Sequence, residues 1–209
     1  MAAHAGKKAA VYAETGTPVA MTDEATTCLN PGTYTQYQIT ATSKRYVDRD
    51  TVITVKKNGV AQPSSSYTFQ ALGGIVTFTS SLLGTDVVTV TGAYRSVVKV
   101  AQFYDWKFDG ELELLDQTCF GDEWQTYAPG PMRASGSGER FWLDNYFVDM
   151  FTNAKTFIIV LYVDDVSGKE RWAMYADLNK LSHSVARGEL IPETINFTAD
   201  GQVVYLQQW

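Results

Sequence analysis

The stretch "VKVAQFYDWKFDGELEL", Val98–Leu114, alternates between two kinds of side chain over its whole length. The even positions are mostly apolar: Val98, Val100, Gln102, Tyr104, Trp106, Phe108, Gly110, Leu112, Leu114. Most of the odd positions are charged or polar: Lys99, Ala101, Phe103, Asp105, Lys107, Asp109, Glu111, Glu113. A period of two residues is that of a β-strand with one buried and one solvated face. The stretch therefore predicts a strand with one apolar and one charged face.

Asp109-Gly110 is a possible hairpin turn inside this stretch. A two-residue turn would pair Phe108 with Glu111 and place a carboxylate on the aromatic face. The unbroken alternation instead favours one long strand, bent or bulged at Gly110. Such a strand is about three times the usual length of ~5 to 6 residues. It must project beyond a compact core or join a sheet larger than one subunit.

The composition narrows the class of protein. The chain has 209 residues, 45% of them apolar, a formal net charge of −6 and a pI near 4.9. The length and the apolar fraction are sufficient for a hydrophobic core. The negative charge argues against a surface that binds nucleic acid, because such a surface needs clustered Lys and Arg. No apolar run approaches the ~20 residues that span a bilayer, so no membrane partner is expected. The two cysteines, Cys28 and Cys119, have no metal-ligand spacing, and no cofactor motif is present.

Strand patterns dominate the rest of the chain, which predicts a mainly β fold: an antiparallel β-sandwich or barrel with one flanking α-helix. We expect an N-terminal β-module over residues 1–95 and a second unit over residues 96–209. Within the second unit, residues 116–142 are predicted to form a long loop. Apolar residues at helical spacing predict a helix over about residues 143–154.

Several strands and turns are predicted individually. Asn58-Gly59 predicts a tight hairpin turn, because this pair tolerates positive φ angles. The segment "TFIIVLYVDD" is apolar on both faces and is expected to be a central strand, joined by the turn "VSGK" to "ERWAMYADL". The segment "PETINFTADGQVVYLQQ" is predicted to be a hairpin that turns at Asp200-Gly201.

Three kinds of functional site are alternatives to a purely structural role. Cys119 with His183 is a conceivable nucleophile and base, and Glu111 with Glu113 is a conceivable glycosidase-like pair. A structural thiol and solvated carboxylates are the ordinary explanations, so no catalytic centre is expected. A carbohydrate-binding β-sandwich remains an alternative because of five tryptophans: Trp106, Trp124, Trp142, Trp172, Trp209.

Residues from Trp106 to Leu206 resemble the tail tube proteins of long-tailed bacteriophages. The resemblance is carried by "DWKFD", "LLDQTCFGDEW", "PGPMRASGSGERFW" and the pair "FIIVLYVDD" and "RWAMYADL". The residues at the family's motif positions are Asp116, Thr118, Phe120, Gly121, Asp122 and Trp142. The N-terminal part is similar to a β-module that recurs in phage structural proteins.

The resemblance implies hexameric rings that self-assemble by stacking into a hollow tube through which genomic DNA passes during ejection. It implies a location in the virion tail, after assembly in the host cytoplasm, and a terminator, tape measure and baseplate as protein partners. A tail terminator or completion protein is an alternative of the same class.

Two sets of site residues follow from these arguments. The charged face of the long strand is predicted to line the lumen: Lys99, Asp105, Lys107, Asp109, Glu111, Glu113. The segment from Asp116 to Trp142 is predicted to be an arm that grips a neighbouring subunit, because it is too long for a simple connection and carries aromatic and Arg anchors. Its predicted inter-subunit residues are Asp116, Thr118, Phe120, Asp122, Trp124, Tyr127, Arg133 and Arg140.

Overall fold

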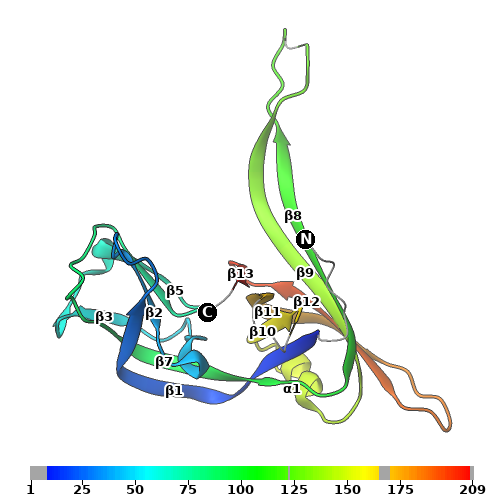
Figure 1. The fold of residues 1–209 in the computed structure, drawn as a ribbon. Helices are drawn as coiled ribbons and strands as arrows, with labels where there is room; N and C mark the ends of the chain where they lie inside the picture. Colours follow the sequence, from blue (N-terminus) through cyan, green and yellow to red (C-terminus); the bar gives the residue numbers. More distant parts are fainter. Residues whose placement is uncertain (1–8, 122, 165–169, 208–209) are drawn as a thin grey trace.

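The computed structural model describes residues 9–121, 123–164 and 170–207. The fold is mainly β, with antiparallel strand pairing throughout and one α-helix among these residues, as predicted (Figure 1). The strands are β1 (Ala10–Cys28), β2 (Gln36–Ile39), β3 (Thr54–Lys57), β4 (Val60–Ala61), β5 (Tyr67–Gln70), β6 (Ile75–Phe78), β7 (Val88–Lys99), β8 (Phe103–Asp116), β9 (Tyr127–Phe141), β10 (Phe157–Tyr162), β11 (Glu170–His183), β12 (Pro192–Ala199) and β13 (Val204–Gln207). The helix is α1 (Tyr146–Thr152), and two short 3-10 helices are η2 (Thr42–Lys44) and η3 (Ser64–Ser66).

The strands are arranged in two lobes and one long arm (Figure 1). The main path of hydrogen-bonded neighbours is β4-β3-β7-β1-β10-β11-β12-β9-β8. The first lobe contains β2 to β6, and the second, which we call the body, contains α1 and β10 to β13. Strands β1 and β7 run through both lobes, since β1 pairs with β7 along most of its length and with β10 at Ala10–Ala13. The predicted division at residue 95 stays a prediction; β7 crosses it, and β1, which lies before it in the sequence, pairs with β10 of the body.

Strand β10 is the centre of the body. Residues Phe157 to Leu161 are all fully buried, which confirms the prediction of a central strand. Its odd residues pack in one cluster with Phe147 of α1, while Ile158 and Val160 pack in another with residues of the first lobe and of β13. The predicted turn "VSGK" that follows β10 lies outside the described residues.

The long strand differs from its prediction at its start. The chain turns between β7 and β8, where Gln102 has φ 65°, so Val98–Leu114 is not one strand. A bulge at Tyr104 then reverses the alternation: Phe103 packs inward, Tyr104 faces solvent, and Trp106 and Phe108 face the core again. No turn occurs at Gly110, as predicted, and the bulges lie at Tyr104 and opposite Glu113 instead.

Residues 116–142 are not mainly a loop. Fifteen of them form β9, which pairs with β8 on one side and with β12 on the other, so that only residues 117–126 connect the two strands at the tip. The predicted hairpin at Asp200-Gly201 is also wrong. Strands β12 and β13 follow one another along the same side of β11, because this 14-residue strand offers enough backbone groups to pair with both.

The Ser-Gly alternation in β9 explains why this segment is a strand. Ser135 and Ser137 pair with Asp109 and Lys107 on the charged face, whereas Gly136 and Gly138 lie opposite Phe108 and Trp106. A Cβ atom on Gly136 would meet the Phe197 ring at 2.5 Å and the Lys107 carbonyl oxygen at 2.5 Å. A Cβ atom on Gly138 would meet the Phe103 ring at 2.5 Å. The glycines therefore leave room for aromatic rings of the core.

We expect Gly136→Ala to destabilise the subunit by about 1–3 kcal/mol, because the added methyl group overpacks a filled site against backbone and a buried ring. The control is Ser137→Ala on the opposite face of the same strand, which is expected to change the free energy of unfolding by less than ~0.5 kcal/mol. Urea denaturation followed by circular dichroism measures both. Equal effects of the two substitutions would contradict the packing role of Gly136.

Candidate assembly interface

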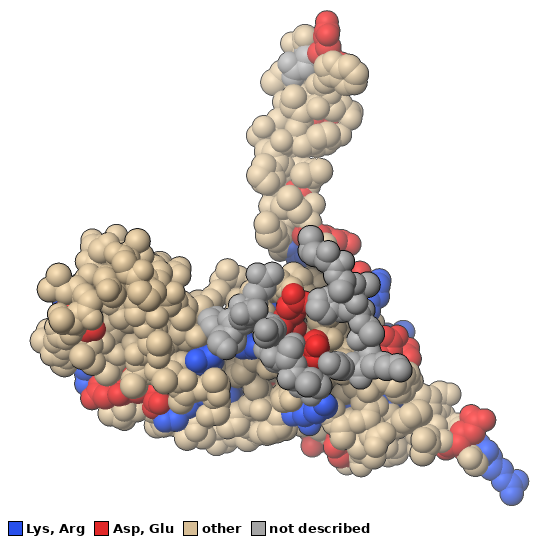
Figure 2. All heavy atoms as spheres, viewed as in Figure 1, with Lys and Arg blue, Asp and Glu red and all other residues tan. Residues whose placement is uncertain are grey.

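Strands β8 and β9 form a two-stranded arm that leaves the body and projects well beyond it (Figure 1). Near the body, Phe103, Trp106 and Phe108 pack against the core. Beyond Gly110 the apolar side chains have no core to pack on and are exposed: Leu112, Leu114, Leu115, Phe120, Trp124, Tyr127, Met132. Phe120 is fully exposed and Trp124 is 82% exposed. From the side shown in Figure 2, the arm is mostly uncharged, with acidic atoms at its tip.

The tip is shaped by hydrogen bonds within the loop. The backbone and hydroxyl groups of Thr118 donate to an Asp116 carboxylate oxygen at 2.9 and 2.5 Å, and the Thr126 backbone donates to the Thr118 hydroxyl at 3.2 Å. The hydroxyl and backbone donors of Thr118 lower the pKa of Asp116. Asp116 and Thr118 therefore hold the loop that presents Phe120 and Trp124. The predicted contact residue Asp122 lies outside the described residues.

The odd positions of β8 form one charged face of the arm. Asp105 lies directly opposite Glu139 and Glu111 directly opposite Arg133. The carboxylates of this face are Asp105, Asp109, Glu111, Glu113 and Glu139, against the cations Lys107 and Arg133. Lys107 pairs with Asp109 at 2.8 Å, and Arg133 is 3.6 Å from Glu113. The face keeps an excess of negative charge. Lys99, which was predicted to share it, instead ends β7 before the turn into β8.

Arg140 was predicted to contact a neighbouring subunit, but it is buried inside this one and only 1% exposed. Its guanidinium binds Glu193 of β12, donates to Asp144 at 3.0 Å and lies over the Phe147 ring. Glu193 also contacts the His183 ring nitrogen at 2.9 Å. The prediction is wrong because β9 enters the body here, so that its side chains face the core. Arg140 fixes the base of the arm.

His183 is thereby committed to Glu193 at the end of β11, whereas Cys119 lies in the tip loop of the arm, far from the body (Figure 1). The structure does not bring the conceivable nucleophile and base together. Among the described residues, no group of three His, Cys, Asp or Glu side chains is placed to hold a metal ion. Within the same residues, no helix is long and apolar enough to cross a membrane.

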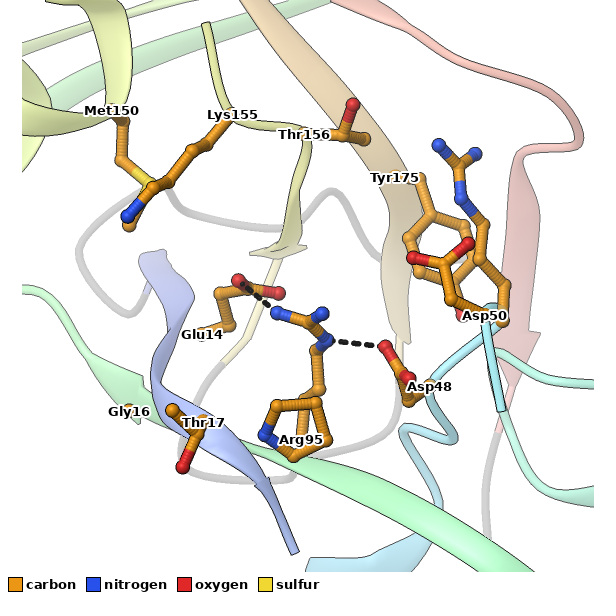
Figure 3. A pocket seen from close by; sticks show the side chains of 12 residues that line it. Glu14, Gly16, Thr17, Asp48, Asp50, Arg95, Met150, Lys155, Thr156 and Tyr175 are labelled. Carbon is orange, nitrogen blue, oxygen red and sulfur yellow. Dashed lines mark hydrogen bonds and ion pairs between the residues drawn. The ribbon is translucent and has the colours of Figure 1, made fainter. Parts of the chain in front are cut away.

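A polar pocket of about 430 Å³ lies where the two lobes meet (Figure 3). Arg95 of β7 donates to Glu14 of β1 at 2.8 Å and to Asp48 at 2.6 Å, and both carboxylates are nearly inaccessible to solvent. Glu14 also accepts the Ile158 backbone N–H at 3.0 Å. Burial raises the pKa of Glu14, although the Ile158 amide and Arg95 oppose the shift.

This buried group joins β1, β7, β10 and the first lobe, and sequence reasoning missed it. Its members lie far apart in the chain, and none belongs to a recognisable motif. A Tyr146 hydroxyl that donates to the Glu14 carbonyl oxygen at 2.6 Å adds α1 to the same junction. The polar groups of the pocket thus mainly satisfy one another, so we assign the pocket a structural role.

We expect Arg95→Gln to destabilise the subunit by about 3–5 kcal/mol at neutral pH, because it leaves two buried carboxylates without their cation. The loss in the free energy of unfolding should become smaller as the pH falls. An acid whose folded-state pKa is raised binds protons more readily when folded, so its unfavourable charge is lost as the pH falls through that pKa, above the ordinary value of 4.5. Thermal unfolding between pH 4.5 and 7.5 measures the effect.

The control for this junction is Arg49→Gln. Arg49 pairs with Asp200 at 2.5 Å, but both side chains are about one-third or more exposed, so the loss should stay within ~1 kcal/mol. A deficit of Arg95→Gln that grows as the pH falls would contradict the structural assignment.

Comparison with known proteins gives similarity in structure alone. No protein-family model and no curated protein sequence matches the chain. The chain is similar to a solved structure described as the tail of an empty gene transfer agent particle with C6 symmetry, at 12% identity and a TM-score of 0.47, over 53% of this chain and 86% of that one. A second is described as the virion of a native gene transfer agent particle, at 11% identity and a TM-score of 0.45, over 52% and 88%.

Proposed function

We propose that this protein is a structural subunit of a phage-like tail tube, in which rings of copies, six in each, stack through their arms around an acidic lumen that conducts DNA. The observation that carries the proposal is the β8–β9 arm, which projects from the body with exposed apolar residues and no core of its own. The resemblance of its motif residues to those of tail tube proteins supports the same function.

The arm needs a partner surface to be stable. A two-stranded ribbon in water is marginally stable at best, and among the described residues no third strand or helix pairs with the distal half of this arm. Phe and Trp rings bury about 150–250 Å² each in an interface, which at about 25 cal/mol per Å² stabilises the bound state by several kcal/mol per ring. Phe120 and Trp124 are therefore natural anchors for a contact with another chain.

The geometry of such a contact favours repeated assembly. An arm that docks elsewhere on a second copy makes a heterologous interface, and heterologous interfaces produce closed rings or open filaments. Strand β8 also has an edge that a neighbouring subunit could cover. Within the described part of the chain it pairs with β9 alone, so its other side offers a long unpaired edge. A neighbouring subunit in a ring would cover this edge and remove the risk of uncontrolled pairing.

The charged face of the arm suits the inside of a tube that passes DNA. Five carboxylates against two cations give each subunit an excess of negative charge there, and a ring of copies multiplies it in a confined space. Phosphates then find few cations to pair with. DNA is repelled from the wall and slides instead of binding.

We expect the purified protein to form tubes of uniform width in negative-stain electron microscopy. Phe120→Ala with Trp124→Ala should leave the subunit folded but raise the concentration needed for assembly by several hundredfold, because the loss of two anchors of about 2 kcal/mol each weakens the contact by about 4 kcal/mol. The control removes equally exposed apolar groups from the first lobe, Val52→Ala with Leu83→Ala, and should assemble normally. A protein that stays monomeric at high concentration would contradict the proposal, and single rings that do not stack would favour a tail terminator.

The lumen assignment has its own test. Replacing Asp109, Glu111 and Glu113 together by Lys breaks only exposed ion pairs, so the fold and the tubes should remain. The lumen should then hold DNA, and genome ejection from virions that carry the variant should slow or stall at low salt and recover as salt rises. Ejection at the normal rate at low salt would show that these side chains do not line the path of the DNA.

A further inference from the structure

A groove of about 520 Å³ lies at the point where the arm leaves the body. Its apolar walls are the stacked rings of Phe108 and Trp172, with centroids 4.6 Å apart, and the side chains of Leu112 and Met132. The turn at Gly201 to Val203, between β12 and β13, closes one side. The volume and the apolar lining are those of sites that bind large organic groups.

The groove exists because one pair of residues on the apolar face of the arm is small. Gly110 lies directly opposite Ala134, between the pairs of Phe108 with Gly136 and of Leu112 with Met132. A Cβ atom on Gly110 would touch only the Phe108 ring, at 3.6 Å, and the backbone there does not need glycine, since its φ is not positive. A larger residue would fit at this position. Because Gly110 has no side chain, the floor of the groove stays open.

We propose that this groove receives the arm tip of a second copy of the chain, with Phe120 inserted between the Trp172 and Met132 walls. This inference rests on the proposed function and names the surface that the arm meets. Phe120 is a fully exposed apolar ring, and the walls of the groove are apolar surfaces open to solvent. Insertion of the ring would remove both from water. The groove also continues into the exposed apolar face of the arm at Leu112 and Met132.

Charges at the rim of the groove orient such a contact. The tip segment from Glu113 to Met132 contains four carboxylates and no Lys or Arg. Two charged residues lie at the rim of the groove: Glu111, and Arg133, whose side chain is 75% exposed and 3.6 Å from Glu113 of the same arm. An acidic tip that reaches this rim is attracted to Arg133 and repelled by Glu111, which orients the contact.

The occupant must come from another copy. Ten residues separate Gly110 from Phe120, and most of them are held in the extended β8 ladder. At ~3.3 Å per residue the tip lies roughly 30 Å from the groove of its own chain. A head-to-tail arrangement, in which each arm reaches the base of the next copy's arm, satisfies the groove and the tip of every subunit except those at the ends.

The direct test uses the native Cys119, which is exposed beside Phe120 at the tip. In a Cys28→Ser background, Gln202→Cys places a thiol at the groove, and diamide oxidation of assembled tubes should give a ladder of disulfide-linked multimers on a non-reducing gel. Ser135→Cys on the opposite face of β9 is the matched control and should give no ladder, as should Gln202→Cys with Cys119→Ser. Thermal melts of all variants confirm that they fold.

A second variant fills the groove from within. Gly110→Val should keep or raise the stability of the subunit, since a β-branched residue suits a strand, and it should raise the assembly concentration at least tenfold by blocking the floor. Ser135→Val, the control, places the same β-branched residue on the opposite face of the arm and should assemble normally.

The outcomes separate this inference from the proposed function. Tubes that form normally with Gly110→Val, and give no ladder with Gln202→Cys, would overturn the groove assignment and leave the tube intact. Dimers without higher multimers would mean a reciprocal contact and would contradict head-to-tail stacking. A wild-type protein that never assembles would contradict both.

Discussion

The structure depends on the way β9 is interlocked with the body. Gly136 and Gly138 bring the β9 backbone within van der Waals reach of the Phe197 and Phe103 rings, and Arg140 fixes the end of the strand through a buried carboxylate. With β9 fixed in this way, β8 is held by its ladder to β9 and, near the body, by the packing of Phe103, Trp106 and Phe108 on the core, and the two strands leave the body as one ribbon. The exposed apolar tip, the acidic face and the groove all follow from this one attachment. Because the base of the arm is fixed in this way, its tip is held in a defined position, which an ordinary loop would not provide.

The strand with two unlike faces, the hairpin turn and the helix could be predicted from the sequence because they depend on local patterns. The alternation of Trp106, Phe108 and Leu112 with carboxylates predicted a strand with two unlike faces and favoured it over a turn at Gly110. Asn58-Gly59 turns as its type requires, with φ angles of 50° and 80°. The helical spacing of apolar residues over about residues 143–154 predicted a helix, and α1 is shorter than this stretch. In each of these cases the deciding interactions lie within a few residues of one another.

What the sequence did not reveal depends on contacts between distant segments. The bulge at Tyr104 reverses the alternation because Phe103 finds space beside Gly138, and no local signal shows this. The Ser-Gly run was predicted to belong to a loop, because the Phe197 and Phe103 rings that require its glycines come from other segments of the chain. Arg140 resembled a surface anchor because its partner Glu193 lies 53 residues away. Strand β1 escaped detection since its bulges, near Gly16 and Asp23, interrupt the period of two.

The central claim is that the distal arm is completed by a neighbouring copy, and hydrogen–deuterium exchange of the backbone amides measures this most directly. In dissociated subunits, amides of β8 and β9 near Trp106 and Gly138 should exchange slowly, whereas those between Glu111 and Arg133 should exchange fast, because the apolar side chains of that half of the ribbon are exposed. Assembly should slow the distal amides by at least tenfold and change the proximal ones little. Distal amides that are equally protected before and after assembly, or that exchange fast in both states, would contradict the account.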